Sequence, residues 1–151
     1  AKGVRAGVVL SSGFSETGER GAQLQAEMAA AARAGGMRLL GPNCLGFVNG
    51  SRGLSVTFSP SRELRWPRLG SIGFVTQSGA FGSHCAAVCC NRGLGLGTWI
   101  TTGNEADLDV ADCIAYLAGD PAIKVIAGYL EGCRDADRLG RLLCSLPERC
   151  W

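Results

Sequence analysis

The sequence predicts an α/β protein built from doubly wound parallel sheets. From Ser71 to Leu143, an apolar run, a glycine-containing loop and a helical stretch follow one another three times, which is the order of right-handed βαβ units. The runs are apolar throughout rather than alternating, as in a sheet that is covered on both faces. Residues 1–50 show the same order. We therefore expect pieces of two such units, joined by a linker.

The first unit is expected to hold two strands and one helix. Gly7–Ser12 is an apolar run that ends in a Ser-Ser-Gly loop, and Met37–Leu40 is a second strand followed by the turn 41–44. Gly21–Arg33 is rich in helix formers, and Gly35 and Gly36 end the helix. Its apolar stripe is predicted at Leu24, Met28 and Ala31.

Residues 48–69 differ from their surroundings in composition. Prolines, serines and arginines cluster there, so we interpret the stretch as a linker that carries one short strand at Leu54–Phe58. A domain boundary is expected within it, which divides the chain into residues 1–60 and 61–151.

The second unit is expected to alternate three strands with three helices. The predicted strands are Ser71–Thr76, Thr98–Thr102 and Lys124–Leu130. The predicted helices are Ala80–Arg92, Leu108–Ala118 and Ala136–Leu143. One face of the first helix is predicted to carry Phe81, His84, Cys85 and Val88, and the second to turn Val110, Ile114 and Leu117 inward.

Composition and charge exclude several classes of protein. Hydrophobic residues make up 46% of the 151 residues and charged residues 19%, which does not fit a disordered chain. Fifteen basic and thirteen acidic residues are scattered along the chain, so we expect no nucleic acid partner. No apolar run reaches the roughly 18 residues of a membrane span, and the start lacks a secretory signal pattern. We therefore expect no membrane association and a cytoplasmic location.

The eight cysteines are expected to be reduced bystanders. A chain of this length needs no disulfide staples, and cysteine in apolar patterns behaves as a small hydrophobe. Cys85 and Cys89 beside His84 are too few ligands for a structural zinc site, so we predict no metal. His84 is the only histidine, and we expect it to be packed or hydrogen-bonded one turn inside its helix.

Ligands of open parallel sheets bind at the carboxyl ends of the strands. At one such end, Ser78 is a natural N-cap residue and Gly79 allows a ligand to approach the backbone, so the helix N-terminus could hold an anion such as phosphate. An ordinary capped turn explains the same residues.

Acidic residues follow two of the other strands. Glu131 could orient an imidazole or accept a proton, or it could be a loop residue in solvent. Glu105, Asp107 and Asp109 precede a helix and are expected to act as caps and dipole partners.

Six ordered motifs carry a resemblance to a known family. They are Val8–Glu16, Leu40–Gly46, Thr57–Pro60, Val75–Phe81, Gly103–Asp109 and Tyr129–Gly132. In this order and spacing the chain resembles the NDP-forming acyl-CoA synthetases, which are relatives of the succinyl-CoA synthetase α subunit. The resemblance implies part of a Rossmann-like CoA-binding domain followed by a flavodoxin-like domain, with the active site between them.

The resemblance also implies roles for particular residues. Those on the side of CoA would be Leu10, Ser11, Ser12, Asn43 and Cys44. The helix N-terminus that holds the phosphate would consist of Ser78, Gly79 and Ala80. Glu131 would orient a phosphorylated imidazole. His84 does not match the family's phosphorylated histidine, and Cys44 is at most a weak candidate nucleophile.

CoA and phosphate are the implied substrates, and a nucleotide-grasp domain or partner subunit would bind the nucleoside di- or triphosphate with Mg²⁺. The family's first CoA loop, histidine segment and nucleotide-grasp domain do not match this sequence, so we expect a central fragment that is inactive alone. Two alternatives stay open: a non-catalytic acyl-CoA-binding or regulatory module of a protein acetyltransferase, and a truncated structural remnant. The chain could also form a homo-oligomer.

Overall fold

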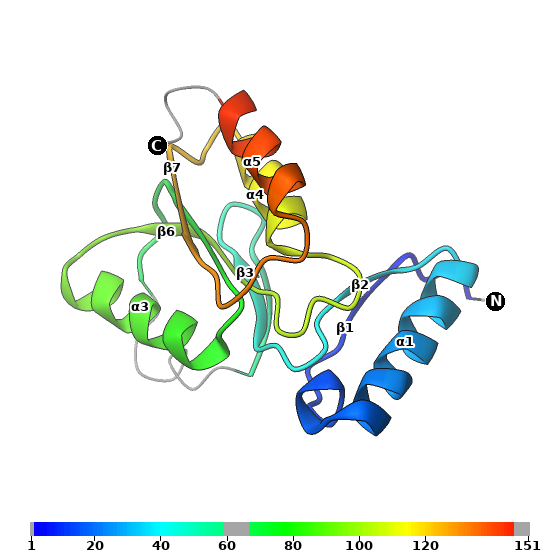
Figure 1. The fold of residues 1–151 in the computed structure, drawn as a ribbon. Coiled ribbons are helices and arrows are strands. Elements are labelled where there is room, and N and C mark those ends of the chain that lie inside the picture. The colour runs from blue at the N-terminus through cyan, green and yellow to red at the C-terminus, as the bar shows by residue number, and fades with distance from the viewer. Residues whose placement is uncertain (1, 59–66, 147–151) are drawn as a thin grey trace.

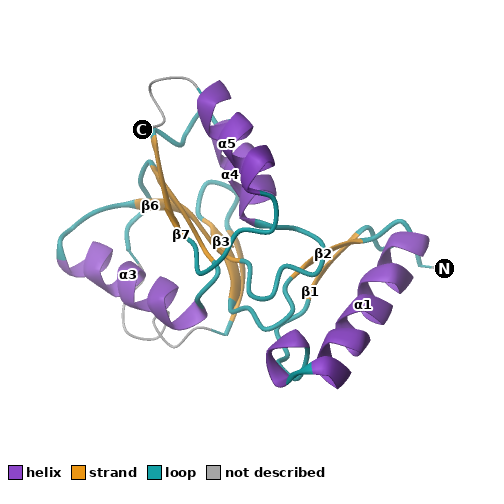
Figure 2. Cartoon of the chain, viewed as in Figure 1, coloured by secondary structure: helices purple, strands orange, loops and turns teal. Residues whose placement is uncertain are grey.

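The computed structural model describes residues 2–58 and 67–146 (Figures 1 and 2). The strands are β1 Ala6–Val8, β2 Arg38–Leu40, β3 Gly46–Asn49, β4 Leu54–Thr57, β5 Ile72–Thr76, β6 Leu96–Thr101 and β7 Val125–Tyr129. The helices are the single 3-10 turn η1 Ser15–Thr17, α1 Glu19–Ala34, α3 Gly79–Asn91, α4 Val110–Ala118 and α5 Ala136–Ser145. The predicted α/β architecture with a parallel sheet is confirmed.

The first unit pairs β1 with β2 in parallel, with α1 as the crossover between them. The strand predicted at Gly7–Ser12 is shorter than expected, because the chain leaves the ladder after Val9, whose N–H still donates to the Leu40 carbonyl. The residues that follow form a loop at the carboxyl end of β1.

The apolar stripe predicted for the first helix is wrong in two of its three positions. Leu24 is 38% exposed and Ala31 is also exposed. The buried positions are Gly21, Ala29 and Ala32. At Gly21 a small residue is required because the η1 loop lies directly on the helix: a Cβ there would come within 1.8 Å of the Phe14 carbonyl oxygen.

The second sheet has the strand order β4-β3-β6-β5-β7. Its β6, β5 and β7 are parallel, whereas β3 runs antiparallel to both β6 and β4. The linker interpretation is therefore wrong for residues 48–57, which form most of a hairpin at the edge of this sheet. The predicted strand at Leu54–Phe58 is present as β4, and the predicted boundary between residues 60 and 61 lies outside the described residues.

Helices cover both faces of the second sheet (Figure 1). On one face, α3 covers a core of Phe74, Ala86, Leu96 and Trp99. On the other, α4 and α5 cover Val75, Ile100, Ile114 and Leu117. Because successive strand residues point to opposite faces, neighbours such as Phe74 and Val75 supply different cores. This explains why the strands are apolar throughout.

The face of the first helix of this unit that was predicted to carry Phe81, His84, Cys85 and Val88 is not its buried face. In α3, Phe81 is 39% exposed and Val88 36%, and His84 is exposed rather than packed. The buried positions are Gly82 and Ala86, because the helix lies close to the Trp99 indole, whose Nε1–H donates to the Gly82 carbonyl (3.0 Å). By contrast, Val110, Ile114 and Leu117 of α4 are buried as predicted.

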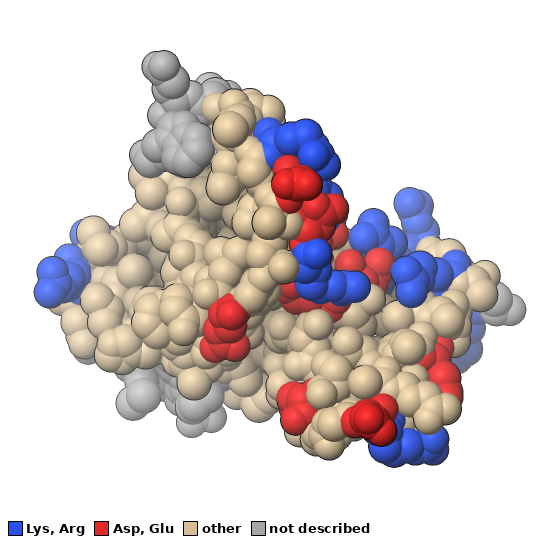
Figure 3. Space-filling view, in the orientation of Figure 1, with Lys and Arg blue, Asp and Glu red and all other residues tan. Residues whose placement is uncertain are grey.

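Charged side chains of both signs lie next to each other on the face seen in Figure 3. Arg38 Nε lies 2.9 Å from Asp107 Oδ2, and Arg138 Nη1 lies 2.8 Å from Asp109 Oδ2. These pairs join β2 and α5 to the segment around the start of α4. The arginine of each pair is exposed to solvent, which weakens the attraction, and ion pairs at the surface contribute about 0–1 kcal/mol each. None of the described helices is both long and apolar enough to cross a membrane.

The seven cysteines among the described residues are free, and they differ in exposure. Cys133 and Cys144 are exposed, whereas burial raises the pKa of Cys44 and, for Cys113, raises it to about 12. Because the thiolate is the reactive form, we expect iodoacetamide at neutral pH to modify Cys133 and Cys144 while sparing Cys44 and Cys113. Peptide mass spectrometry measures this directly. In denaturant all four should react, and early native labelling of Cys113 would contradict its placement in the core.

Candidate functional site

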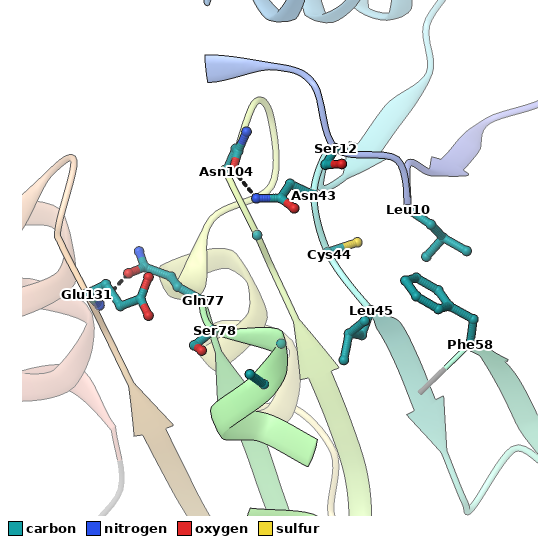
Figure 4. Close-up of a pocket in the computed structure, with 13 residues that line it drawn as sticks. Leu10, Ser12, Asn43, Cys44, Leu45, Phe58, Gln77, Ser78, Asn104 and Glu131 are labelled. Atoms are coloured by element: carbon teal, nitrogen blue, oxygen red, sulfur yellow. Dashed lines mark hydrogen bonds between the residues drawn. The ribbon is translucent and has the colours of Figure 1, made fainter. Parts of the chain in front are cut away.

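A cavity of about 390 Å³ lies at the carboxyl ends of the parallel strands (Figure 4). It is lined by Leu10, Ser12, Asn43, Cys44, Leu45, Phe58, Gln77, Ser78, Gly79, Ala80, Gly103, Asn104 and Glu131. All the predicted site residues except Ser11 are among them. The fold thus brings together residues that are more than a hundred positions apart in the sequence.

The N-terminus of α3 forms one wall of the cavity. Ser78 is its N-cap, and the Ser78 hydroxyl oxygen accepts a hydrogen bond from the Phe81 N–H (3.3 Å). Helix geometry leaves the first N–H groups, those of Gly79 and Ala80, without partners inside the helix. A Cβ at Gly79 would lie 2.7 Å from Leu45 Cγ, so glycine keeps the helix end close to the opposite wall. Unpaired N–H groups and the helix dipole favour an anion here.

The loops after β1 and β2 form the opposite wall. Asn43 has a φ of +56°, and its backbone N–H donates to the Ser11 carbonyl (2.9 Å), so the two loops hold each other. Cys44 is buried, and its Sγ lies 3.5 Å from the Val9 carbonyl oxygen. Since burial raises its pKa, the Cys44 thiol is protonated near neutral pH, which argues against a nucleophilic role.

Asn104, which was not among the predicted site residues, connects the loop after β6 to the first unit. Its Oδ1 accepts from Asn43 Nδ2 (3.2 Å), and its Nδ2 donates to Gln25 Oε1 (3.1 Å) and to the Glu16 carboxylate. Although desolvation acts to raise the pKa of Glu16, hydrogen bonds from Asn104 and from the backbone of Gly13 and Phe14 lower it to about 2. Glu16 therefore stays ionised and holds this amide across a wide range of pH.

Glu131 follows β7 at the edge of the cavity, and the residue is exposed. Its backbone N–H donates to Gln77 Oε1 (2.6 Å), a contact that Figure 4 shows between the loops after β7 and β5. An exposed carboxylate beside an anion site can accept an N–H from an imidazole that approaches from solvent.

The acidic residues before α4 cap backbone groups, as predicted. Asp109 is the N-cap of α4 and forms a capping box with Asp112. Asp107 Oδ2 accepts from the Leu39 N–H (2.8 Å). Glu105 is only 3% exposed and accepts from Thr102 Oγ1 (2.8 Å) and the Val110 N–H (3.0 Å), and burial raises its pKa. Among the described residues, no group of three His, Cys, Asp or Glu side chains is placed to hold a metal ion.

The cavity-lining residues that were not assigned a role at the site fall into two groups. Gln77, Gly103 and Asn104 directly follow predicted strands, so their position at strand ends was a usable signal. Leu45 and Phe58 reach the cavity from the segments that flank the hairpin β3–β4, and their place in the motifs Leu40–Gly46 and Thr57–Pro60 was the usable signal. His84 lies farther along α3 and is not among the residues that line the cavity.

Comparisons with known proteins agree with this geometry. Residues 69–149 match the family described as the succinyl-CoA ligase-like flavodoxin domain. The chain is 39% identical over 137 residues to the α subunit of ADP-forming acetate–CoA ligase II from Pyrococcus furiosus, covering 91% of this chain and 29% of that protein. It is 38% identical over 148 residues to ADP-forming acetate–CoA ligase I from Archaeoglobus fulgidus, covering 98% and 21%.

A solved structure shows the same fold. The dinucleotide-forming acetyl-coenzyme A synthetase 1 of Ca. Korarchaeum cryptofilum, in complex with phosphate and ADP, superposes with a TM-score of 0.83 at 34% identity. The match covers 95% of this chain and 29% of that one, so the chain spans less than a third of the length of each of these relatives. With more than half of its residues matched and its fold shared, the chain belongs to the succinyl-CoA ligase-like family.

Proposed function

We propose that this chain is part of an NDP-forming acyl-CoA ligase and binds CoA and phosphate in the cavity at the strand ends. The observation that carries the proposal is that the loops around Ser12 and Asn43 and the N-terminus of α3 line one cavity. CoA would place its thiol end against the first two loops, and the phosphoryl group would lie on the α3 end. The relative solved with phosphate and ADP supports this chemistry.

The α3 end would stabilise the phosphoryl group as the reaction proceeds. The reaction interconverts acyl-CoA, phosphate and NDP with acid, CoA and NTP through an acyl phosphate and a phosphohistidine. Preorganised N–H donors and the helix dipole stabilise charge without rearranging during transfer. Glu131 at the rim would orient the imidazole that accepts the phosphoryl group, and holding an imidazole in one tautomer is what a carboxylate partner does in other active sites.

Turnover would require groups that these residues do not supply. The chain's one histidine, His84, is not among the cavity-lining residues, so we assign the phosphorylated histidine to a segment beyond residues 1–151 or on a partner. We assign the Mg²⁺–nucleotide complex to a nucleotide-grasp domain in the same way. Free cysteines fit a reducing compartment, and we propose the cytoplasm.

Calorimetric titration of the purified chain with inorganic phosphate and with CoA tests the proposal. Replacing Ser78 by alanine removes a hydroxyl at the anion site and should weaken phosphate binding about tenfold, since hydrogen bonds to charged groups contribute about 1.5–3 kcal/mol. Ser71→Ala is the matched control, because Ser71 is exposed and precedes β5 at the other end of the strand. Phosphate binding that Ser78→Ala leaves unchanged, or no binding by the folded wild type, would contradict the proposed site.

A further inference from the structure

The Gln77 side chain extends the pairing of β5 with β7 beyond the end of both strands. The last backbone bond between them runs from the Gln77 N–H to the Tyr129 carbonyl (3.2 Å). Past it, Gln77 Oε1 accepts from the N–H groups of Glu131 (2.6 Å) and Gly132 (3.0 Å), and Gln77 Nε2 donates to the Gly132 carbonyl (2.8 Å). The side-chain amide of Gln77 thus makes the hydrogen bonds that a further backbone residue of β5 would make with the chain after β7.

The backbone of the Glu131–Gly132 turn decides which way the amide faces. The flipped amide would place its oxygen against the Gly132 carbonyl, which is an acceptor, and its NH2 group against the N–H groups of Glu131 and Gly132, which are donors. The amide oxygen is therefore left facing these two N–H groups. The segments that follow β5 and β7 meet at this one amide.

Most of the hydrogen-bonding capacity of this amide is used inside the protein. An amide side chain has two N–H donors and one oxygen with two lone pairs. One donor serves the Gly132 carbonyl, and the oxygen serves the N–H groups of Glu131 and Gly132. Although Gln77 lines the cavity, three of its four hydrogen-bonding positions hold this turn.

We infer that Gln77 is a positioning residue, which holds the Glu131–Gly132 turn at the rim of the cavity so that the Glu131 carboxylate faces the anion site. The inference deepens the proposed function, because it takes the role of Glu131 from there. Glu131 itself is exposed, and its place at the rim comes from its anchored backbone.

Nuclear magnetic resonance of the full chain tests the inference at two levels. In Gln77→Ala, hydrogen exchange of the Glu131 and Gly132 amides should accelerate about fivefold or more, which corresponds to a hydrogen bond of about 1 kcal/mol. The Phe81 amide, which Ser78 caps, should keep its exchange rate. Gln23→Ala is the matched control, because Gln23 is an exposed glutamine on α1. Unchanged exchange at Glu131 in Gln77→Ala would overturn the inference.

The second level adds inorganic phosphate. In the wild type, phosphate should shift the amide resonances of both Gly79 and Glu131; in Gln77→Ala the shift at Gly79 should persist and that at Glu131 should be lost. A wild type that shows no shift at all refutes the proposed function but not the anchoring, which the exchange rates decide by themselves. A Glu131 shift that survives in the variant refutes the positioning role.

A nearly isosteric variant distinguishes the effect of losing the N–H donors from the effect of shortening the side chain. Gln77→Glu keeps the length but turns the donor atom into an acceptor that faces the Gly132 carbonyl. We expect exchange at Glu131 as fast as in Gln77→Ala. Wild-type exchange in Gln77→Glu would show that the donors are irrelevant and would overturn the orientation argument.

Discussion

Replacing Leu117 by alanine is expected to lower the free energy of unfolding by about 2–5 kcal/mol, the range for buried leucines. Leu117 is fully buried in the core between the second sheet and the helices α4 and α5. The truncation would leave a cavity that close-packed neighbours fill only in part. Urea denaturation followed by circular dichroism measures the change.

The chain offers a matched control for this result. Leu94 is 45% exposed in the turn that leads into β6, so Leu94→Ala should change stability by no more than about 0.5 kcal/mol. Equal losses in the two variants would mean that α4 does not pack on the sheet as described.

Replacing Gly103 by alanine is expected to destabilise the protein by about 2–5 kcal/mol and to disrupt the cavity. Gly103 has a φ of +61°, where a side chain costs about 1–2 kcal/mol. An added Cβ would also lie 2.2 Å from the Pro42 carbonyl oxygen and 2.6 Å from that of Asn43, and overpacking adds about 1–3 kcal/mol. The loops after β2 and β6 would have to separate, which would break the contact between Asn43 and Asn104 and weaken phosphate binding.

Gly53 isolates the backbone contribution to this effect. Its φ is +63°, but a Cβ there would meet no atom within 4 Å. Gly53→Ala should therefore show only the backbone cost of about 1–2 kcal/mol and should leave phosphate binding unchanged. If thermal unfolding and calorimetry gave the same losses for both variants, the close approach of the two loops would be refuted.

The sequence was sufficient to predict the order of strands and helices in the second unit, because each element has a local signal. Ser78 and Asp109 cap the helices that they precede, and apolar runs mark β5, β6 and β7. Since the carboxyl ends of parallel strands lie at one edge of the sheet, the position of the cavity could be predicted as well. Eight of the residues that line it, among them Ser12, Asn43 and Ser78, were assigned to the site through the resemblance that the six ordered motifs carry.

The burial of helix faces was not predictable in the same way. Apolar spacing favoured Leu24 in α1 and Phe81 in α3, yet both are more than a third exposed. The inward positions are glycines and alanines, because these helices approach their neighbours closely, and closeness of approach is a property of the packed structure. The strand β3 was missed for a related reason, although β4 was predicted: its partner β6 lies about fifty residues away, and pairing at that distance leaves no local pattern.

The sequence by itself determined the α/β class, the helix caps and the strand-end loops, since these depend on residues close together in the chain. Tertiary structure alone decided how the loops are held at the site. Asn104 reaches Asn43 and Glu16, and Gln77 reaches Glu131, across separations of 54 to 88 residues. Such contacts depend on which strands pair and on which loops the pairing brings together. Local patterns in the sequence do not show either of these.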